Sequence, residues 1–135
     1  MKVMTKRIMI SLLVMLTSVL AIVADDYAQA TFPVQSHDFG TIKEDGGPVT
    51  CTFEFVNTGN KPLIIVDALA SCGCTRPEFP TKPIKPGKKG KIKVTYSPIG
   101  RPGAFRKQVK VKTNGREGRT TLIIEGTVIP AKGKR

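Results

Sequence analysis

Short apolar segments punctuated by glycine and proline run through most of this sequence, and they constrain its fold more than any other feature. The chain has 13 glycines and 10 prolines among its 135 residues. Beyond residue 30 no window shows sustained apolar spacing of about 3.6 residues, so helices are not expected. Residues 49–55 and 91–96 instead alternate apolar with polar side chains, which is typical of strands with one buried face. The pattern predicts an all-β domain.

Turn signals at intervals of about 8–12 residues divide the chain into about seven strands, as in a sandwich of immunoglobulin-like type. The predicted strands cover residues 31–36, 38–42 (entered through a turn), 49–55, 63–69, 91–96, 105–113 and 119–129. The nearly continuous apolar run of 63–69 favours a strand that is covered on both sides or lies at the centre of the sandwich. Residues 77–86 contain four prolines and therefore form an edge or a crossing loop. We expect antiparallel pairing, with a small barrel as the alternative.

The first thirty residues have the organisation of a secretory signal peptide. Basic Lys2, Lys6 and Arg7 precede an apolar run at 8–24, and Ala28-Gln29-Ala30 follows it. Small side chains at the first and third of these last positions are what the signal peptidase accepts. The sequence therefore predicts export, with cleavage after Ala30.

Cleavage there divides the chain into a signal peptide (1–30), one immunoglobulin-like domain (31–130) and a basic tail (131–135). Export places the domain in the periplasm or outside the cell. The alternative is an uncleaved membrane anchor, because the 17 apolar-run residues of 8–24 are near the lower limit of about 17–25 for a spanning helix. With the signal removed, no stable membrane span is expected.

Charge is distributed unevenly along the exported part. Residues 31–80 contain three basic and six acidic residues, whereas residues 81–135 contain sixteen basic and two acidic ones. This asymmetry suggests a basic face, although lysines on strand exteriors also keep β-proteins soluble and protect their edges. The expected partner is a protein or an anionic component of the cell envelope. Nucleic acid is not favoured, because the chain has no Trp and two Tyr, too few aromatic side chains for base stacking.

The sharpest chemical feature is Cys72-Gly73-Cys74, with a third cysteine at Cys51. Glycine between the thiols would let the backbone turn tightly. The strand alternation points Cys51 inward, and the antiparallel course of the chain places it at the same end of the domain as the other two cysteines. An oxidising compartment favours a disulfide, and the odd number leaves one thiol over.

Four roles are open to these cysteines. Two of them form a structural disulfide, Cys51 pairing with Cys72 or Cys74 or the latter two with each other, while the third is a buried apolar residue. A Cys72–Cys74 disulfide closes a small ring and would be exchangeable, and Arg76 is the nearest cation to lower a thiol pKa. Three thiolates would suit Cu(I), making Cys72, Cys74 and Cys51 speculative metal ligands. The odd cysteine could instead link two chains.

No constellation in the sequence indicates an enzyme. His37 is the single histidine, and its neighbour Asp38 points to the other face of a strand. There are no paired carboxylates, no G-x-S-x-G and no phosphate-binding glycine loop. We therefore predict no catalytic residues and no cofactor.

Short motifs are distributed along nearly all of residues 31–129. They are His37-Asp38-Phe39-Gly40-Thr41-Ile42, Phe53-Glu54-Phe55-Val56-Asn57-Thr58-Gly59, Pro62-Leu63-Ile64-Ile65, Ser71-Cys72-Gly73-Cys74-Thr75, Pro83-Ile84-Lys85-Pro86-Gly87, Val94-Thr95-Tyr96, Arg101-Pro102-Gly103-Ala104-Phe105, Thr113-Asn114 and Gly126-Thr127-Val128. These motifs and their order resemble those of the DUF1573 family of exported bacterial proteins. The resemblance implies an immunoglobulin-like domain related to those of pilus chaperones, major sperm protein and cilium-associated modules. It implies no reaction, and Cys51 is not part of the family pattern.

These observations lead to an expectation about function. The chain is predicted to be an exported, non-enzymatic binding or scaffolding module whose partner meets a sheet edge or a basic face. The alternative is a thiol-redox or Cu(I)-binding protein that uses the Cys-Gly-Cys motif.

Overall fold

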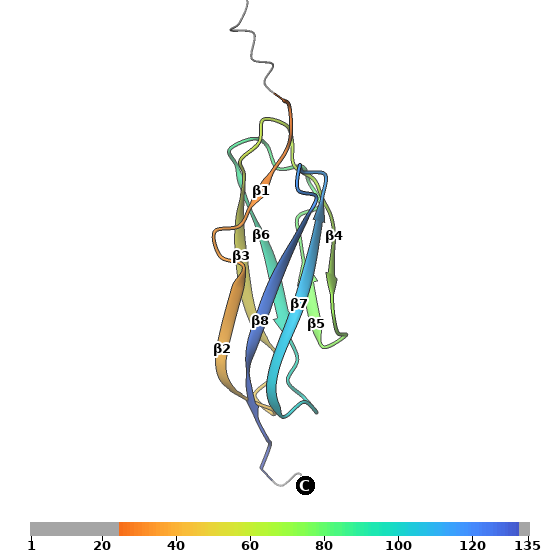
Figure 1. Cartoon of the computed structure of the whole chain (residues 1–135). Helices are drawn as coiled ribbons and strands as arrows, with labels where there is room; N and C mark the ends of the chain where they lie inside the picture. The colour runs from red at the N-terminus through yellow and green to blue at the C-terminus, as the bar shows by residue number, and fades with distance from the viewer. Residues whose placement is uncertain (1–24, 133–135) are drawn as a thin grey trace, which may run out of the picture.

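The computed structural model describes residues 25–132 as a sandwich of two four-stranded sheets (Figure 1). The strands are β1 (Ala30–Thr31), β2 (Ser36–Lys43), β3 (Val49–Asn57), β4 (Ile65–Ala70), β5 (Thr75–Glu78), β6 (Lys89–Tyr96), β7 (Gly103–Thr113) and β8 (Arg119–Ile129). One sheet has the order β1-β3-β6-β5 and the other β2-β8-β7-β4. The all-β, immunoglobulin-like prediction is confirmed.

The core lies between the two sheets and follows the strand alternation. On β3 the apolar residues of one face are buried while Thr50, Thr52 and Glu54 are exposed. Strand β6 pairs with β3 in continuous antiparallel register and alternates in the same way. Its Tyr96 ring stacks on Phe105 of β7, across the core, at 4.0 Å between ring centroids. The aromatic contact closes one end of the sandwich, since removing this apolar area from water favours the packed state.

One pairing in the sandwich is parallel, contrary to the expectation of a wholly antiparallel structure. Strand β2 pairs with β8 in parallel, and every other strand pair is antiparallel in the described part of the chain. The parallel pair is possible because the whole rest of the domain separates β2 from β8 in sequence, which is more than a crossover connection needs.

The N-terminal strand differs from the prediction. Instead of one strand at 31–36, β1 ends at Thr31, and the chain leaves its sheet to begin β2 in the other sheet at Ser36. The residues expected to form a turn at 38–40 lie inside β2 as a bulge. Gly40 has a φ of 68° there, and its N–H donates to Asp38 Oδ1 at 2.7 Å. The residues that the sequence predicts as a turn thus form a bulge within a strand.

Strand β4 is an edge strand, so the prediction of a strand covered on both sides is wrong. It pairs with β7 alone. Val66 is 52% exposed and Leu69 is 60% exposed, while Ile65 and Ala68 face the core. An apolar run therefore did not signal burial of both faces here, because edge position depends on the order of the strands and not on their composition. The predicted edge at 77–86 is confirmed in part, since β5 is an edge strand that includes Pro77.

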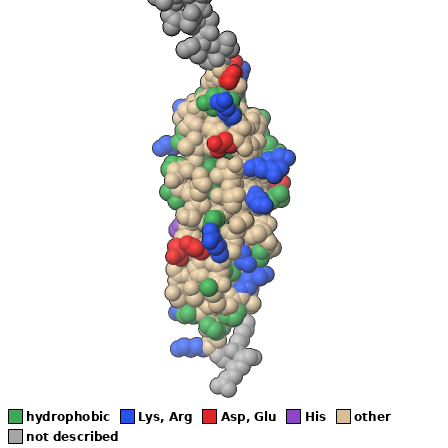
Figure 2. Space-filling model, in the orientation of Figure 1, with side chains coloured by type: hydrophobic (Ala, Val, Ile, Leu, Met, Phe, Trp, Pro, Cys, Tyr) green, Lys and Arg blue, Asp and Glu red, His purple; other side chains and the backbone are tan. Residues whose placement is uncertain are grey.

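The basic residues do not gather on a single face. Lys89, Lys91 and Lys93 of β6 point outward from one sheet, and Lys110 and Lys112 of β7 point outward from the other. These outer faces lie on opposite sides of the core. Figure 2 likewise shows lysine and arginine side chains dispersed along the length of the visible face. The charge asymmetry along the sequence therefore becomes two basic faces instead of one.

The predicted signal peptide lies almost wholly outside the described residues, as do the last three residues of the predicted basic tail. Within residues 25–132 no helix is long and apolar enough to cross a membrane. The predicted cleavage after Ala30 stays a prediction, although residues 25–30 belong to the described part of the chain.

Candidate functional site

The Cys-Gly-Cys motif forms the connection between β4 and β5. Cys72 and Cys74 are joined by a disulfide, with 5.2 Å between their Cα atoms. The N–H of Thr75 donates to Cys72 O at 3.1 Å, closing a turn around the pair. Cys74 is buried in the core, whereas Cys72 packs at its margin and is partly exposed. The two cysteines of the disulfide therefore differ in exposure.

Hydrogen bonds attach this loop to both sheets. Ser71 N–H donates to Gln108 O at 3.0 Å, and Gln108 N–H donates to Ser71 Oγ at 3.1 Å. On the other side, Ser97 N–H donates to Cys74 O at 2.9 Å. Gln108 belongs to β7, and Ser97 directly follows β6 in the opposite sheet. The disulfide loop thus closes one side of the sandwich, a structural arrangement that needs no further chemistry.

Gly73 is not required by its backbone conformation. Its φ is not positive, and a Cβ built at this position would meet no atom within 4 Å. The expectation that glycine allows a tight turn between the thiols therefore finds no support in the backbone or in the surrounding space.

Cys51 lies apart from the pair, buried on β3 and unpaired. The registers place Val49 and Thr75 on either side of Tyr96, so Cys51 and the disulfide lie toward the same end of the sheet, with β6 between them. Burial raises the pKa of the Cys51 thiol to about 11. The free thiol is consequently protonated at neutral pH, which makes it a poor nucleophile there.

The described residues do not assemble a metal centre from the three cysteines. No group of three or more His, Cys, Asp or Glu side chains converges within residues 25–132. The single histidine, His37, is exposed on β2 and contacts the Phe39 ring edge-on at 4.6 Å between centroids. Its neighbour Asp38 accepts the Gly40 N–H. The structure therefore joins neither His37 nor Cys51 to the disulfide.

A shallow cationic hollow, which sequence reasoning missed, lies where β6 leads into β7. It measures about 320 Å³ and is lined in part by Tyr96, Arg101, Arg106 and Lys107. Burial raises the pKa of Tyr96, and the positive charge of Arg101 partly opposes this. Arg101 lies in the loop before β7, and Arg106 and Lys107 lie near the start of β7. The cluster therefore comes from one short basic stretch of the sequence, which could have indicated it.

The outer edge of β3 lacks a strand partner along most of its length within the described residues. Strand β1 pairs with only Asn57 and Val56 of β3, and within residues 25–132 no strand pairs with the outer edge from Val49 to Phe55. Asn57 N–H donates toward β6, to Lys88 O at 2.9 Å. Because N–H groups alternate sides along a strand, the N–H and C=O groups of residues 50, 52 and 54 point outward, away from β6.

The other exposed edges each carry a feature that discourages pairing. Strand β5 has four residues, one of them Pro77. Strand β2 is interrupted by the bulge at Gly40. Strand β4 has an irregular register, and the carboxylate of its Asp67 accepts the Ala68 N–H at 2.8 Å. The edge of β3 has a continuous register and no such feature.

A hollow lies beside this open edge, where the chain passes from β1 to β2. It measures about 290 Å³ and is lined by Pro33, Val34, Thr52 and Glu54. Val34 is 61% exposed. The hollow is mostly apolar, and it borders two of the residues whose backbone groups point outward. Unpaired backbone and an apolar hollow next to it are the two features that bind an extended peptide.

Comparison with protein families identifies the family of this chain. The family described as "Protein of unknown function (DUF1573)" matches residues 30–128. The chain belongs to the DUF1573 family. No curated protein matches the sequence.

Solved structures share the fold of this DUF1573 protein at low sequence identity. A protein of unknown function from Porphyromonas gingivalis W83 is 15% identical with a TM-score of 0.66; the match covers 79% of this chain and 50% of that one. The ASH/PapD-like domain 7 of human CEP192 is 15% identical with a TM-score of 0.63, over 83% and 93% of the two chains. The E. coli chaperone DraB is 10% identical with a TM-score of 0.52, over 80% and 58%.

These likenesses concern the fold alone. The chain spans half the length of the Porphyromonas gingivalis protein that it matches. An immunoglobulin-like sandwich serves many functions, so function has to be argued from the site.

Proposed function

We propose that this DUF1573 protein is an exported, non-enzymatic binding module that holds an extended segment of a partner protein along the outer edge of β3. The observation that carries the proposal is the continuous, unpaired stretch of β3 from Val49 to Phe55. Export is supported by the signal-like organisation of the first thirty residues. The resemblance of the fold to chaperone and PapD-like domains is consistent with a binding role.

Strand addition accounts for both affinity and selectivity at such an edge. The outward N–H and C=O groups of residues 50, 52 and 54 would bond to the main chain of the incoming segment, whatever its sequence. Alternate side chains of that segment would lie over the outer face, next to Thr52 and Glu54. One of them would enter the hollow formed with Pro33 and Val34, so the bound segment carries an apolar residue at that position.

Charge around the edge suits a neutral or mildly acidic segment. Glu54 forms an exposed ion pair with Lys91 at 4.0 Å, and Lys93 lies opposite Thr52 on the neighbouring strand. Lys93 likewise lies 3.9 Å from Glu78. Exposed pairs of this kind contribute little to stability, so both lysines can exchange them for acidic groups of a bound peptide.

The thiol alternative gains no support from the geometry. Its two candidate cysteines are joined within a loop that is attached to both sheets, and the third is buried and protonated. The non-enzymatic reading is consistent with the likeness of the fold to chaperone and PapD-like domains.

The proposal is tested with Thr52→Pro, which removes an outward N–H without removing a bond to β6. The matched control is Thr52→Val, which changes the side chain and keeps the N–H. The probe is a displayed library of ten-residue random peptides, selected on the wild-type domain. Selected peptides should bind the wild type and Thr52→Val alike and bind Thr52→Pro at least about tenfold more weakly, since a backbone hydrogen bond is lost and a partner group left unsatisfied.

Chemical denaturation of both variants shows whether the fold is retained. Peptides that bind all three proteins equally, or a library that yields no binders, would contradict the proposal. Concentration-dependent dimerisation of the wild type that Thr52→Pro abolishes would assign the edge to a second copy of this chain instead. Titration of the labelled domain should shift the amides of residues 50, 52 and 54 more than those of 51, 53 and 55.

A further inference from the structure

Residues 25–30, which we call the N-terminal segment, are packed into the domain. Ala28 is 4% exposed and Ala30 is 7% exposed, and both belong to the core cluster. Ala30 lies opposite Asn57 in the register of β1 and β3. Small side chains fit here because the segment passes close to the neighbouring backbone. The two alanines that make this stretch look like a cleavage site are therefore buried core residues.

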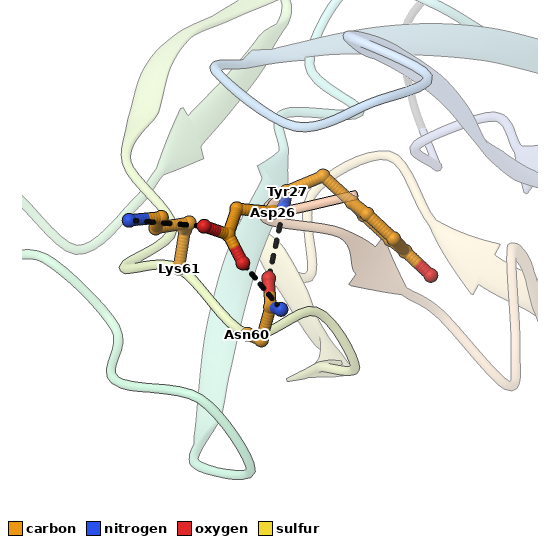
Figure 3. Close-up of polar contacts among 4 residues, drawn as sticks. All are labelled: Asp26, Tyr27, Asn60 and Lys61. Atoms are coloured by element: carbon orange, nitrogen blue, oxygen red, sulfur yellow. Dashed lines mark hydrogen bonds and ion pairs between the residues drawn. The ribbon is translucent and has the colours of Figure 1, made fainter. Parts of the chain in front are cut away.

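One side of the N-terminal segment is bound to the turn after β3 (Figure 3). Tyr27 O accepts the N–H groups of Asn60 at 2.8 Å and Lys61 at 3.2 Å, and Tyr27 N–H donates to Asn60 Oδ1 at 2.8 Å. Asn60 Nδ2 donates to Asp26 Oδ1 at 3.0 Å, and Lys61 Nζ lies 3.7 Å from Asp26 Oδ2. The turn is thus bound to the segment through the backbone of Asn60 and Lys61 and through both of their side chains.

The other side of the segment is bound to the turn between β7 and β8. Arg116 N–H donates to Ala28 O at 2.8 Å, and the Arg116 guanidinium lies 4.8 Å from the centre of the Tyr27 ring. Glu117 N–H donates to Gln29 Oε1 at 3.3 Å. The segment thus connects the turns of two different sheets at one end of the sandwich.

Both turns carry a glycine where the segment passes. A Cβ at Gly59 would collide with Tyr27 O and with the backbone of Ala28, and a Cβ at Gly115 would lie 3.1 Å from Ala28 O. Neither glycine has a positive φ, so backbone conformation does not require glycine at these positions. Glycine is required there because a side chain would occupy the space through which the N-terminal segment passes.

Asn57 is a buried residue that would lose a hydrogen bond if the segment were removed. Its side chain is fully buried, donates to Lys61 O at 2.7 Å and Ile84 O at 2.9 Å, and accepts the N–H groups of Gly59 and Gln29. Cleavage after Ala30 would remove Gln29 and uncover this network together with the apolar residues under the two alanines. Buried polar groups that lose partners destabilise a fold.

We infer that the exported chain keeps the N-terminal segment and that the signal peptidase hydrolyses the Ala24–Asp25 bond instead of the bond after Ala30. Water is the co-reactant, leaving a carboxylate on Ala24 and a free amine on Asp25. Ala24 supplies the small residue required next to the bond and ends the apolar run of 8–24, whereas Ile22 stands two positions before it in place of the first small residue of an A-x-A site. The inference rests on the proposed export, and it moves the boundary of the mature domain from residue 31 to residue 25.

The direct test is the N-terminus of the mature protein. The full chain is produced in an exporting bacterial host, recovered from the periplasm and analysed by intact mass and N-terminal sequencing. A chain that begins at Asp25 supports the inference. A chain that begins at Thr31 overturns it and leaves export intact, whereas uncleaved protein that stays in the cytoplasm overturns export and the cut together.

Ala28→Asp in the full chain gives a second readout, because residue 28 affects the mature protein only if it is retained. Retention predicts that the melting temperature of the mature protein falls by at least about 10 °C, since a carboxylate enters the core. Val34→Asp, at an exposed position nearby, should leave it unchanged. If cleavage followed Ala30, Ala28→Asp would instead block processing and accumulate precursor. Should Ala28→Asp fail to fold, the milder Ala28→Ser should show a smaller fall.

Discussion

The ring of Phe55 lies directly over the backbone of Gly90, its cross-strand partner in β6. Phe55 is fully buried and also packs against Phe32, with 5.2 Å between ring centroids. A Cβ at Gly90 would collide with the Phe55 ring. Glycine therefore serves here to let an aromatic ring fill the core above the strand, which offsets the usual cost of glycine in a strand interior.

Gly90→Ala should destabilise the domain by about 1–3 kcal/mol, because the ring or the strand has to move to admit the methyl group. Urea denaturation followed by circular dichroism measures the change. Gly73→Ala is the matched control and should stay within about 0.5 kcal/mol of the wild type, since its surroundings are open and its φ is ordinary. Equal losses at the two positions would show that the Phe55 contact does not determine the effect.

Replacing both cysteines of the disulfide should lower the free energy of unfolding only a little. Cys72→Ser with Cys74→Ser opens a very short loop, and a chain-entropy estimate for such a loop is at most about 2 kcal/mol. The hydrogen bonds of Ser71 and Ser97 would still attach the segment to both sheets. Peptide binding at the edge of β3 should not change. Loss of all binding by a double variant that remains folded would instead favour the thiol alternative.

Cys51 should make stability fall at alkaline pH. Burial raises the pKa of its thiol from 9.0 to about 11, so the folded state holds the proton more tightly than the unfolded state does. The protonated thiol of Cys51 therefore makes its full contribution to the free energy of unfolding below pH 9. This contribution is lost as the pH rises toward 11, and the free energy of unfolding falls by up to about 1.4 kcal/mol per pH unit.

The comparison that isolates this effect is the difference in unfolding free energy between the wild type and Cys51→Ala from pH 7 to 11. All other ionisable groups are the same in both proteins, so their contributions to the difference cancel. A difference that stays constant across the range would mean that the thiol is not shielded from water in the folded state.

The strands that could be predicted are those whose local alternation matches their final environment. Residues 119–129 form β8 as expected, and 91–96 fall within β6. The composition of 63–69 suggested burial on both faces, yet Val66 and Leu69 are exposed because β4 is at an edge. Which strand occupies an edge depends on pairings between distant segments, and these leave no trace in the local pattern.

In the candidate site too, local features could be predicted from the sequence, whereas features that depend on long-range pairing could not. The Cys72–Cys74 pair could be singled out from the sequence, but whether Cys51 joined it depended on the register of β3, β6 and β5. The open edge of β3 arises because β1 ends at Thr31 and the chain changes sheets. Ala28 and Ala30 have the spacing of a processing site, and only tertiary packing distinguishes that spacing from two core positions.

The parallel pairing of β2 with β8 has a mechanical consequence. The described chain enters at one end of the sandwich and β8 ends at the other (Figure 1), and these two strands run side by side in the same direction. Tension applied between the two ends of the domain would pull β2 and β8 in opposite directions along their common axis. Their hydrogen bonds would then share the load in shear and yield together, instead of opening one after another.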